Sequence, residues 1–147
     1  MTFVVTANPP TATAESPVIN DGWWPDIDLQ QLRADCRLDN TVTAPRLRRA
    51  VVDAVAGIND ELAAWQSAQW AAGHATLSAV PAPQIDGKSV KLAQYMRAVG
   101  AAVQADLAEA YRDMSTLPEG ANKEGRVLAA LDVRQDAFRR QLRWALA

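Results

Sequence analysis

The residues that could do chemistry are few, and they are scattered along the 147-residue chain. His74 is the one histidine and Cys36 the one cysteine, so a single subunit offers neither a histidine-based metal site nor a histidine acid–base pair. The sequence contains no phosphate-binding glycine loop, no Gly-x-Ser-x-Gly elbow and no cluster with metal-ligand spacing. We therefore expect no enzymatic activity, no cofactor and no metal site.

The isolated candidates have simple structural interpretations. Cys36 lies on the apolar side of a short helical pattern, where a small buried side chain is the expected role, and a lone cysteine fits a reducing cytosol. His74 follows Gly73 at an expected helix end, where a contact with the helix terminus is favoured. Asp26 and Asp28 stand at a helix entrance, and capping by one of them is favoured over ion binding because nothing else gathers ligands there.

Aromatic side chains are the first feature that rises above this background. The chain has five tryptophans, at positions 23, 24, 65, 70 and 144. Pro25 biases Trp24 away from helical geometry and holds the pair Trp23–Trp24 extended at the helix entrance. Trp65 falls on an apolar stripe and Trp70 falls off it. We expect one ring of the pair to pack on the bundle and the other to face outward, since tryptophan is enriched at interface hot spots.

Arginine is the second feature, with three residues in one turn of each of two expected helices. A solvated face is the simplest interpretation, and contact with the acidic part of an adjacent copy or with DNA is the alternative. The candidate interface then comprises Asp21, Trp23, Trp24, Asp26 and Asp28 on one side, and Arg46, Arg48 and Arg49 or Arg139, Arg140 and Arg143 on the other.

The charge of the chain is balanced overall but graded along its length. Fifteen basic and 17 acidic residues give a net charge of -2, which is no general signal for nucleic acid. Residues 1–40 carry two basic and six acidic side chains, whereas residues 88–147 carry ten and seven. This gradient suits head-to-tail contact between copies. Charged residues interrupt every apolar run, so no membrane-spanning segment is expected.

The hydrophobic periodicity predicts an all-α fold. Residues 1–20, rich in Thr, Ala and Pro, are expected to form an extended, flexible N-terminal arm, and residues 21–147 a helical domain. We expect a short helix over 28–36 and long helices over 45–73, 88–114 and 123–147, hence a small bundle of three long helices plus one short N-terminal helix. Gly57 suggests a close packing contact or a bend, Gly73 a helix cap, and the uncharged run 98–103 burial on all sides.

Several short motifs occur in a recognisable order. They are Trp23-Trp24-Pro25-Asp26-Ile27-Asp28, Arg37-Leu38-Asp39-x-Thr41-Val42, Ala44-Pro45-Arg46-Leu47-Arg48, Ile85-Asp86-Gly87-x-Ser89-Val90-Lys91 and Leu142-Arg143-Trp144-Ala145. From Gly22 to Ala147 the chain resembles the head-completion protein family (GpL) of tailed bacteriophages with contractile tails, which is similar to head-to-tail connector proteins.

The resemblance implies a structural virion protein of the head–tail neck, made in the host cytoplasm. Such a protein binds the portal after genome packaging and forms a neck ring on which the tail is joined. The implied partners are further copies in a homo-oligomeric ring that matches the portal symmetry, the portal protein and a downstream tail or neck protein, with non-specific contact to channel DNA and no membrane. The alternative is a nucleic-acid-binding packaging subunit, against which the net charge and the lack of aromatic–basic alternation argue.

Overall fold

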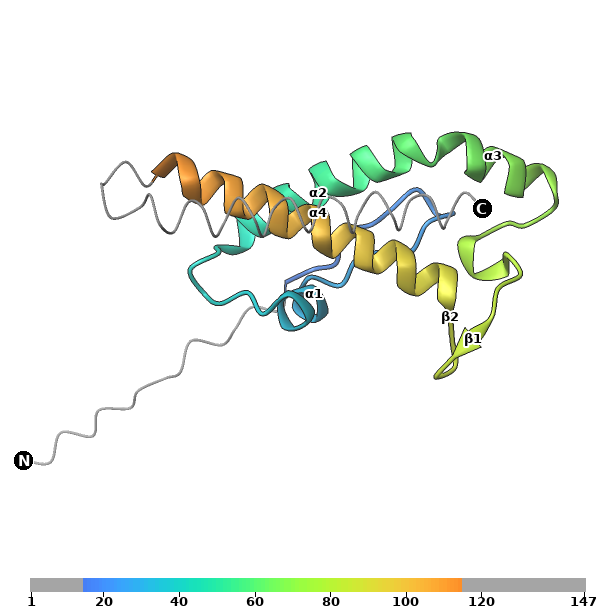
Figure 1. Cartoon of the computed structure of the whole chain (residues 1–147), viewed down its shortest axis with the longest axis horizontal. Coiled ribbons are helices and arrows are strands. Elements are labelled where there is room, and N and C mark those ends of the chain that lie inside the picture. The colour runs from blue at the N-terminus through green and yellow to red at the C-terminus, as the bar shows by residue number, and fades with distance from the viewer. Residues whose placement is uncertain (1–14, 115–147) are drawn as a thin grey trace, which may run out of the picture.

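A computed structural model describes residues 15–114, in which two long helices run along the molecule and shorter elements cover their ends (Figure 1). The elements in chain order are α1 (Leu29–Cys36), α2 (Ala44–Glu61), α3 (Ala63–Ala71), the 3-10 helix η1 (Leu77–Ala79), β1 (Gln84–Ile85), β2 (Lys88–Ser89) and α4 (Val90–Met114). The expected helix over 123–147 and residues 1–14 lie outside the described residues.

The short helix α1 forms where the sequence predicts it. The Asp28 carboxylate accepts the backbone N–H groups of Gln30 and Gln31 at 2.9 and 3.1 Å, which satisfies two donors of the first turn. Leu29 and Leu32 are buried on one side of the helix. The helix ends at Arg37, which adopts the left-handed conformation with φ 53°. The N–H of Leu38 then donates to the carbonyl of Arg33 at 2.9 Å, the closing bond of a Schellman motif.

The single helix predicted over 45–73 is two helices, α2 and α3. Leu62 separates them with φ -94° and ψ 4°, outside regular helical geometry, and its side chain is buried. The buried Leu62 side chain holds this junction on the core, and backbone hydrogen bonds continue across it, from Leu62 to Ile58 at 3.0 Å and from Gln66 to Leu62 at 2.9 Å. Gly57 is not the cause, because it is exposed and open space surrounds it, so the expectation of a close contact there was wrong. Gly73, with φ 93°, terminates α3 as predicted.

The all-α prediction needs a correction, because the fold is mostly helical but contains a small two-stranded sheet. Strands β1 and β2 pair antiparallel, with Gln84 opposite Ser89 and Ile85 opposite Lys88. Asp86 and Gly87 form the connecting turn with φ 52° and 70°, the positive values that a tight two-residue hairpin of type I′ requires. The sequence analysis expected a helix from residue 88 and missed the strands, which have two residues each.

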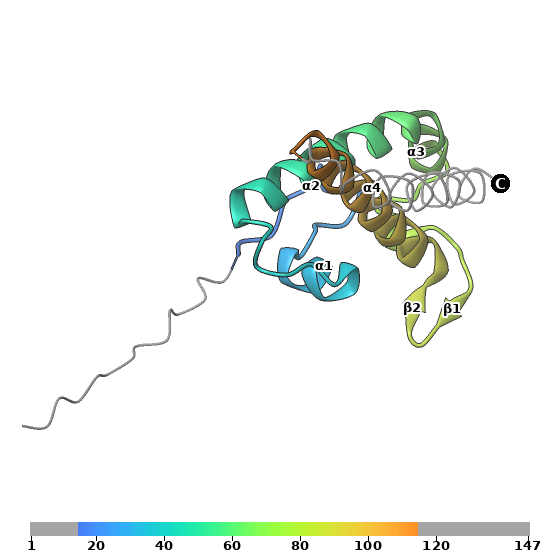
Figure 2. The ribbon, with the colours of Figure 1, turned by 60° about the vertical axis from the view of Figure 1, so that its left-hand side comes forward.

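Helix α4 is the element on which the others pack, with α2 along it and α1 across it (Figures 1 and 2). Ala98, Val99, Gly100 and Val103 are buried, whereas Ala101 and Ala102 are only half-buried, so the burial expected on all sides is confirmed for part of this run. A Cβ on Gly100 would lie 3.3 Å from Cys36 Sγ, which shows that glycine allows α1 to approach closely. The core comprises Val18, Trp23, Trp24, Ile27, Leu29, Leu32, Val42, Leu47, Ala50, Val51, Val55, Ile58, Leu62, Leu77, Val80, Tyr95, Ala98, Val99, Val103 and Leu107.

The last residues of the expected N-terminal arm belong to this packed structure. Val18 is buried and exchanges two backbone hydrogen bonds with Ile27, both at 2.9 Å. The carboxylate of Glu15 forms an ion pair with Arg33 at 2.7 Å, and hydrogen bonding to this guanidinium lowers the pKa of Glu15. Residues 15–20 are therefore held against the helices, which composition alone does not indicate.

Candidate functional site

A tight turn positions the tryptophan pair in the hydrophobic core. The carboxylate of Asp21 accepts the backbone N–H groups of Trp23 and Trp24 at 2.9 and 3.0 Å, and Gly22 supplies the positive φ of 91° that the turn requires. Burial acts to raise the pKa of Asp21, but the hydrogen bonds from Trp24, Gln66 and Trp23 outweigh it and leave the pKa lowered. Asp21 therefore serves the local fold as a charged hydrogen-bond acceptor.

The two rings form an aromatic cluster that joins the turn at Asp21 to α3 and α4. The Trp23 and Trp24 rings meet edge to face at 4.6 Å between centroids, and Trp24 stacks on Tyr95 at 4.7 Å. Trp65 packs against both tryptophans, at 5.8 and 6.1 Å. The Trp23 indole N–H donates to the backbone carbonyl oxygen of His74 at 3.0 Å. These contacts engage both tryptophan rings within a single chain.

The expectation that one ring of the pair faces outward was wrong. Trp23 and Trp24 are each only 3% exposed, because the turn at Asp21 directs both rings into the space between the helices. Replacing either ring with alanine would leave a core cavity, a change that typically costs about 3–5 kcal/mol of folding stability. Neither ring is accessible to a partner, so the outward aromatic role must fall to another residue.

A buried polar network, which the sequence analysis did not identify, lies beside the aromatic cluster. The Tyr95 hydroxyl donates to Asn59 Oδ1 at 2.7 Å and accepts from Asn20 Nδ2 at 3.0 Å, while Asn59 Nδ2 donates to Asn20 Oδ1 at 2.9 Å. Burial raises the pKa of Tyr95 to about 12, and the nearby charge of Asp21 acts in the same direction. Nothing in the sequence signalled this network, since the two asparagines come from an arm and a helix far apart in the chain.

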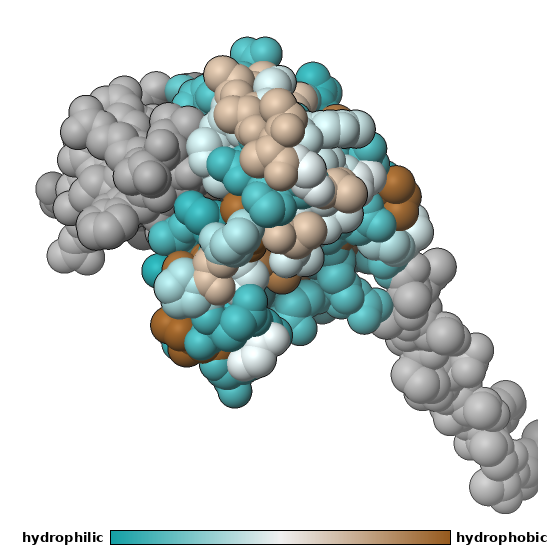
Figure 3. Space-filling model, turned by 90° about the vertical axis from the view of Figure 1, so that its right-hand side faces the viewer, coloured by the Kyte–Doolittle hydropathy of each residue, from teal (hydrophilic) through white to brown (hydrophobic). Residues whose placement is uncertain are grey.

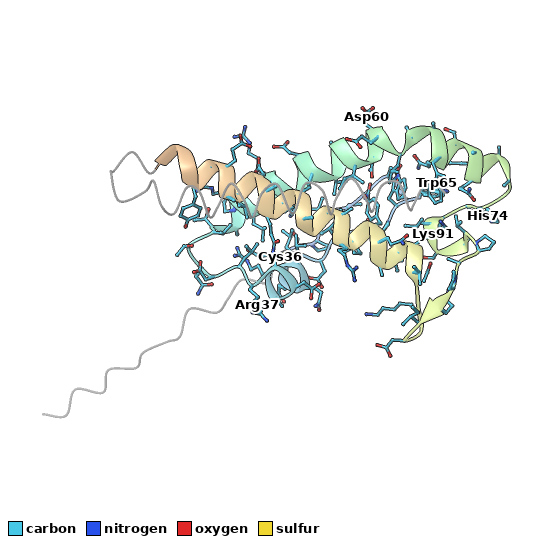
Figure 4. All side chains as sticks on the ribbon, in the orientation of Figure 1. Cys36, Arg37, Asp60, Trp65, His74 and Lys91 are labelled. Carbon is cyan, nitrogen blue, oxygen red and sulfur yellow. The ribbon has the colours of Figure 1, made fainter. Side chains whose placement is uncertain are left out.

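The remaining acidic candidates also have structural roles. Asp28 caps α1, as predicted, and Asp26 accepts the backbone N–H of Asn20 at 2.8 Å. Between residues 15 and 114, no group of three or more His, Cys, Asp or Glu side chains could hold a metal ion. Cys36 and His74 lie far from each other, Cys36 on α1 and His74 beyond α3 at one end of the molecule (Figure 4). They cannot form a nucleophile–base pair within one chain.

The first arginine group divides into three different environments. Arg48 donates to the backbone carbonyls of Ser16 and Pro17 at 2.9 and 3.3 Å, so it holds the N-terminal segment. Arg46 lies over the ring of Tyr111, with its guanidinium carbon 5.8 Å from the centroid. Arg49 is exposed and makes no hydrogen bond or ion pair within the described residues. Arg139, Arg140 and Arg143 lie outside those residues.

Two surface features near opposite ends of the molecule complete the candidate site. Helix α3 carries Trp70, which is 64% exposed, and Ile85 at the hairpin is 68% exposed. Toward the other end, an open hollow of about 320 Å³ lies between the α1–α2 connection and α4. Its lining residues are Cys36, Arg37, Leu38, Asp39, Thr41, Val42, Gln104, Leu107, Ala108 and Tyr111. The sequence analysis noted Trp70 as lying off the apolar stripe but gave no indication of the hollow.

Within the described residues, exposed aromatic and charged side chains are the most prominent surface features of a small, mostly helical protein. Comparison with known proteins gives a specific assignment. Residues 18–147 match the phage head completion protein family (GPL), and the chain belongs to that family. It is also 38% identical over 139 residues to the head completion/stabilization protein of Escherichia phage P2, with 94% of this chain and 80% of that protein covered.

No solved structure matches the chain significantly. None of the helices within residues 15–114 is both long and apolar enough to cross a membrane.

Proposed function

We propose that this protein is a structural component of a tailed-phage virion that completes the DNA-filled head by binding the portal at its vertex. The observation that carries the proposal is the 38% identity to the phage P2 head completion/stabilization protein, which extends over nearly the whole of this chain. Membership of the head completion family supports the same role. The protein acts by occupying a place in the assembly rather than by catalysis.

The portal vertex presents several identical positions around the channel, so copies of this protein would form a ring there, and the tail would be joined on it. A ring requires two different surfaces on each copy, because each contact is made between unlike faces of neighbours. The aromatic helix α3 and the hollow beside Tyr111 are two such unlike surfaces. Helix α3 and the last turn of α4, which carries Tyr111, lie toward opposite ends of the long axis (Figure 1).

The alternative of a nucleic-acid-binding packaging subunit gains little support from the first arginine group. Binding to phosphates requires basic side chains that are accessible together. Arg48 is bonded to the N-terminal segment and Arg46 lies over Tyr111, which leaves Arg49 as the member of this group with no such contact. Contact with channel DNA is therefore a secondary feature of the proposal.

The test uses DNA-filled heads prepared from a phage mutant that lacks this protein. Purified protein is added to the heads, and two quantities are measured: the fraction of packaged DNA that stays resistant to nuclease, and the fraction of heads that accept tails. Both fractions should rise with added protein, and electron microscopy should show new density at the portal vertex alone.

Density spread over the whole capsid surface, or unchanged DNA retention with no binding at the vertex, would overturn the proposal. A Trp24→Ala variant is a useful negative control because its defect should appear as loss of folding, not as altered binding by a folded protein.

A further inference from the structure

Helix α3 presents an unusual surface for a helix in a small protein. Its nine residues include no charged side chain, and none of them is buried, although Trp65 is partly buried against the core. Trp70 is 64% exposed in its last turn. Figure 3 faces this end of the molecule and shows moderately hydrophobic residues gathered over its upper part. A surface helix normally carries polar and charged residues on the side that faces water, so this surface is suited to burial by a partner.

Acidic residues stand directly beside this helix. Asp60 and Glu61 occupy the last turn of α2, just before the break at Leu62, and both are exposed. Figure 4 shows Asp60 pointing away from the molecule. Neither forms an ion pair with any described residue. Both carboxylates are therefore accessible to a partner at the junction of α2 and α3.

The hollow beside Tyr111 complements helix α3 and its acidic neighbours, because its lining is apolar and arginines stand beside it. Leu38, Val42 and Leu107 contribute apolar side chains to its lining. Arg37 also lines it, and Arg46 lies over the Tyr111 ring.

Arg49 extends this basic edge, because it follows Arg46 by three positions on the same side of α2. Asp39 is the one carboxylate in the lining, and it already accepts hydrogen bonds from Thr41. By helical spacing, Asp106 and Glu109 lie on the opposite side of α4 from Tyr111. The hollow therefore has an apolar interior and a basic edge.

We propose that helix α3 of one copy, with Trp70 as its main contact residue, seats in the hollow beside Tyr111 of the next copy. The occupant is a second copy because the two surfaces match in apolar character and in the sign of their charges: an exposed helix without charged residues, next to two acidic residues, meets an apolar hollow beside arginines. This contact rests on the proposed function and specifies how neighbouring copies meet in the ring. Trp70 provides most of the affinity, while the charges mainly set the register.

The charge complementarity gives a direct test. One variant, Asp60→Lys with Glu61→Lys, reverses the acidic side, and the other, Arg46→Glu with Arg49→Glu, reverses the basic side. Alone, each variant places like charges across the contact, and the fraction assembled on purified portals should fall about tenfold or more. Mixed in equal amounts, the two variants should assemble in alternating order, because every contact then joins opposite charges. Assembly is scored by electron microscopy of portal-bound rings.

Cross-linking locates the contact independently. In a Cys36→Ser background, protein carrying Ala71→Cys, which leaves Trp70 in place, is mixed with protein carrying Thr41→Cys and assembled on the portal under mild oxidation. A disulfide-linked dimer should form from this mixture, because Ala71 is exposed beside Trp70. It should not form when Val52→Cys replaces Ala71→Cys, although Val52 is also exposed, at 46%.

Each of these outcomes decides the proposal. Rings formed equally well by either charge variant alone, or cross-linking of Val52→Cys in place of Ala71→Cys, would overturn it and leave portal binding intact. Failure of the wild-type protein to bind portals would instead refute the proposed function. If Arg46→Glu prevents folding through its contact with Tyr111, Arg37→Glu with Arg49→Glu provides the same charge reversal.

Discussion

At the scale of single residues, the end of α1 shows a conformation that its side chain does not favour. Arg37 has φ 53°, in the left-handed region where a Cβ costs roughly 1 kcal/mol. Glycine usually occupies this position of a Schellman motif. Arg37 also lines the hollow beside Tyr111, where its charged side chain is placed to contact a partner. The strained backbone at this residue is then a cost in stability that accompanies the contact.

Arg37→Gly should raise the free energy of unfolding by about 0.5–1 kcal/mol, because glycine adopts positive φ without the Cβ penalty. Urea denaturation followed by circular dichroism measures this change. Arg37→Ala is the matched control: it removes the same charge but keeps a Cβ, so its stability should stay close to that of wild type. An equal gain in both variants would attribute the effect to charge and not to backbone strain.

The Tyr95 hydroxyl is a second residue-scale determinant, because it links Asn20 and Asn59 inside the core. Tyr95→Phe leaves one amide donor and one amide oxygen without their partner and should cost about 1–3 kcal/mol. Tyr111→Phe is the control, since that hydroxyl meets Thr41 at an exposed position and its loss should cost under about 0.5 kcal/mol. Equal costs for the two variants would show that the buried network contributes nothing specific.

Tyr95 also predicts a dependence of stability on alkaline pH. Its pKa is raised to about 12 by burial, against about 10 in an unfolded chain, so the unfolded state loses the proton first. The contribution is fully present below pH of about 10 and is lost as pH rises toward 12. Stability should therefore fall more steeply between pH 10 and 12 in wild type than in Tyr95→Phe, as measured by urea denaturation at a series of pH values.

At the scale of elements, two glycines in helices have opposite surroundings. Gly57 in α2 has nothing within 4 Å of the position of an added Cβ, whereas in α4 the Cβ of an alanine at 100 would lie 3.3 Å from Cys36 Sγ and 3.7 Å from Leu32 Cδ1. The first glycine therefore only weakens its helix. The second permits α1 to cross α4 at close range, which brings the Asp28-capped helix onto the core.

Gly57→Ala should stabilise the protein by up to about 1 kcal/mol, since alanine is the better helix former and nothing obstructs it. Gly100→Ala should gain less or destabilise, because Cys36 and Leu32 must move. The relief of this crowding can be measured directly: in a Cys36→Ala background, Gly100→Ala should become more favourable than in wild type. Additive effects of the two substitutions would exclude the close contact.

At the scale of the whole molecule, the segment 15–20 closes the structure around the aromatic cluster. Glu15 pairs with Arg33, Val18 pairs with Ile27, and Asn20 completes the network at Tyr95. These contacts join residues from the expected arm to α1, α2 and α4. The predicted boundary at residue 20 therefore divides a region that packs as one unit.

Deletion of residues 1–20 should lower the free energy of unfolding by about 3 kcal/mol or more relative to deletion of residues 1–14. The difference comes from the loss of the buried Val18 side chain and from the hydrogen-bonding groups left unpaired at Ile27, Asn59 and Tyr95. Thermal and urea denaturation of the two truncated proteins measure it. Equal stability would show that this segment adds no net stability.

Hydrophobic periodicity and capping residues in the sequence were sufficient to determine the helical character of the chain. Local preferences, which act within a few residues, account for helix α1, the start of α2 near Pro45, the end of α3 at Gly73 and the existence of α4. The motif order also identified the family before any geometry was known. Capping by Asp28 followed from its position at a helix entrance.

The tertiary structure decided which of the conspicuous side chains are accessible. Trp23 and Trp24 looked like partner-binding residues, but the turn at Asp21 buries both, and Trp70 is the exposed ring instead. Arg48 is used internally because residues 16 and 17 happen to lie beside it. The break at Leu62, the Asn20–Asn59–Tyr95 network and the hollow beside Tyr111 likewise result from contacts between segments distant in sequence, and local preferences carry no information about such contacts.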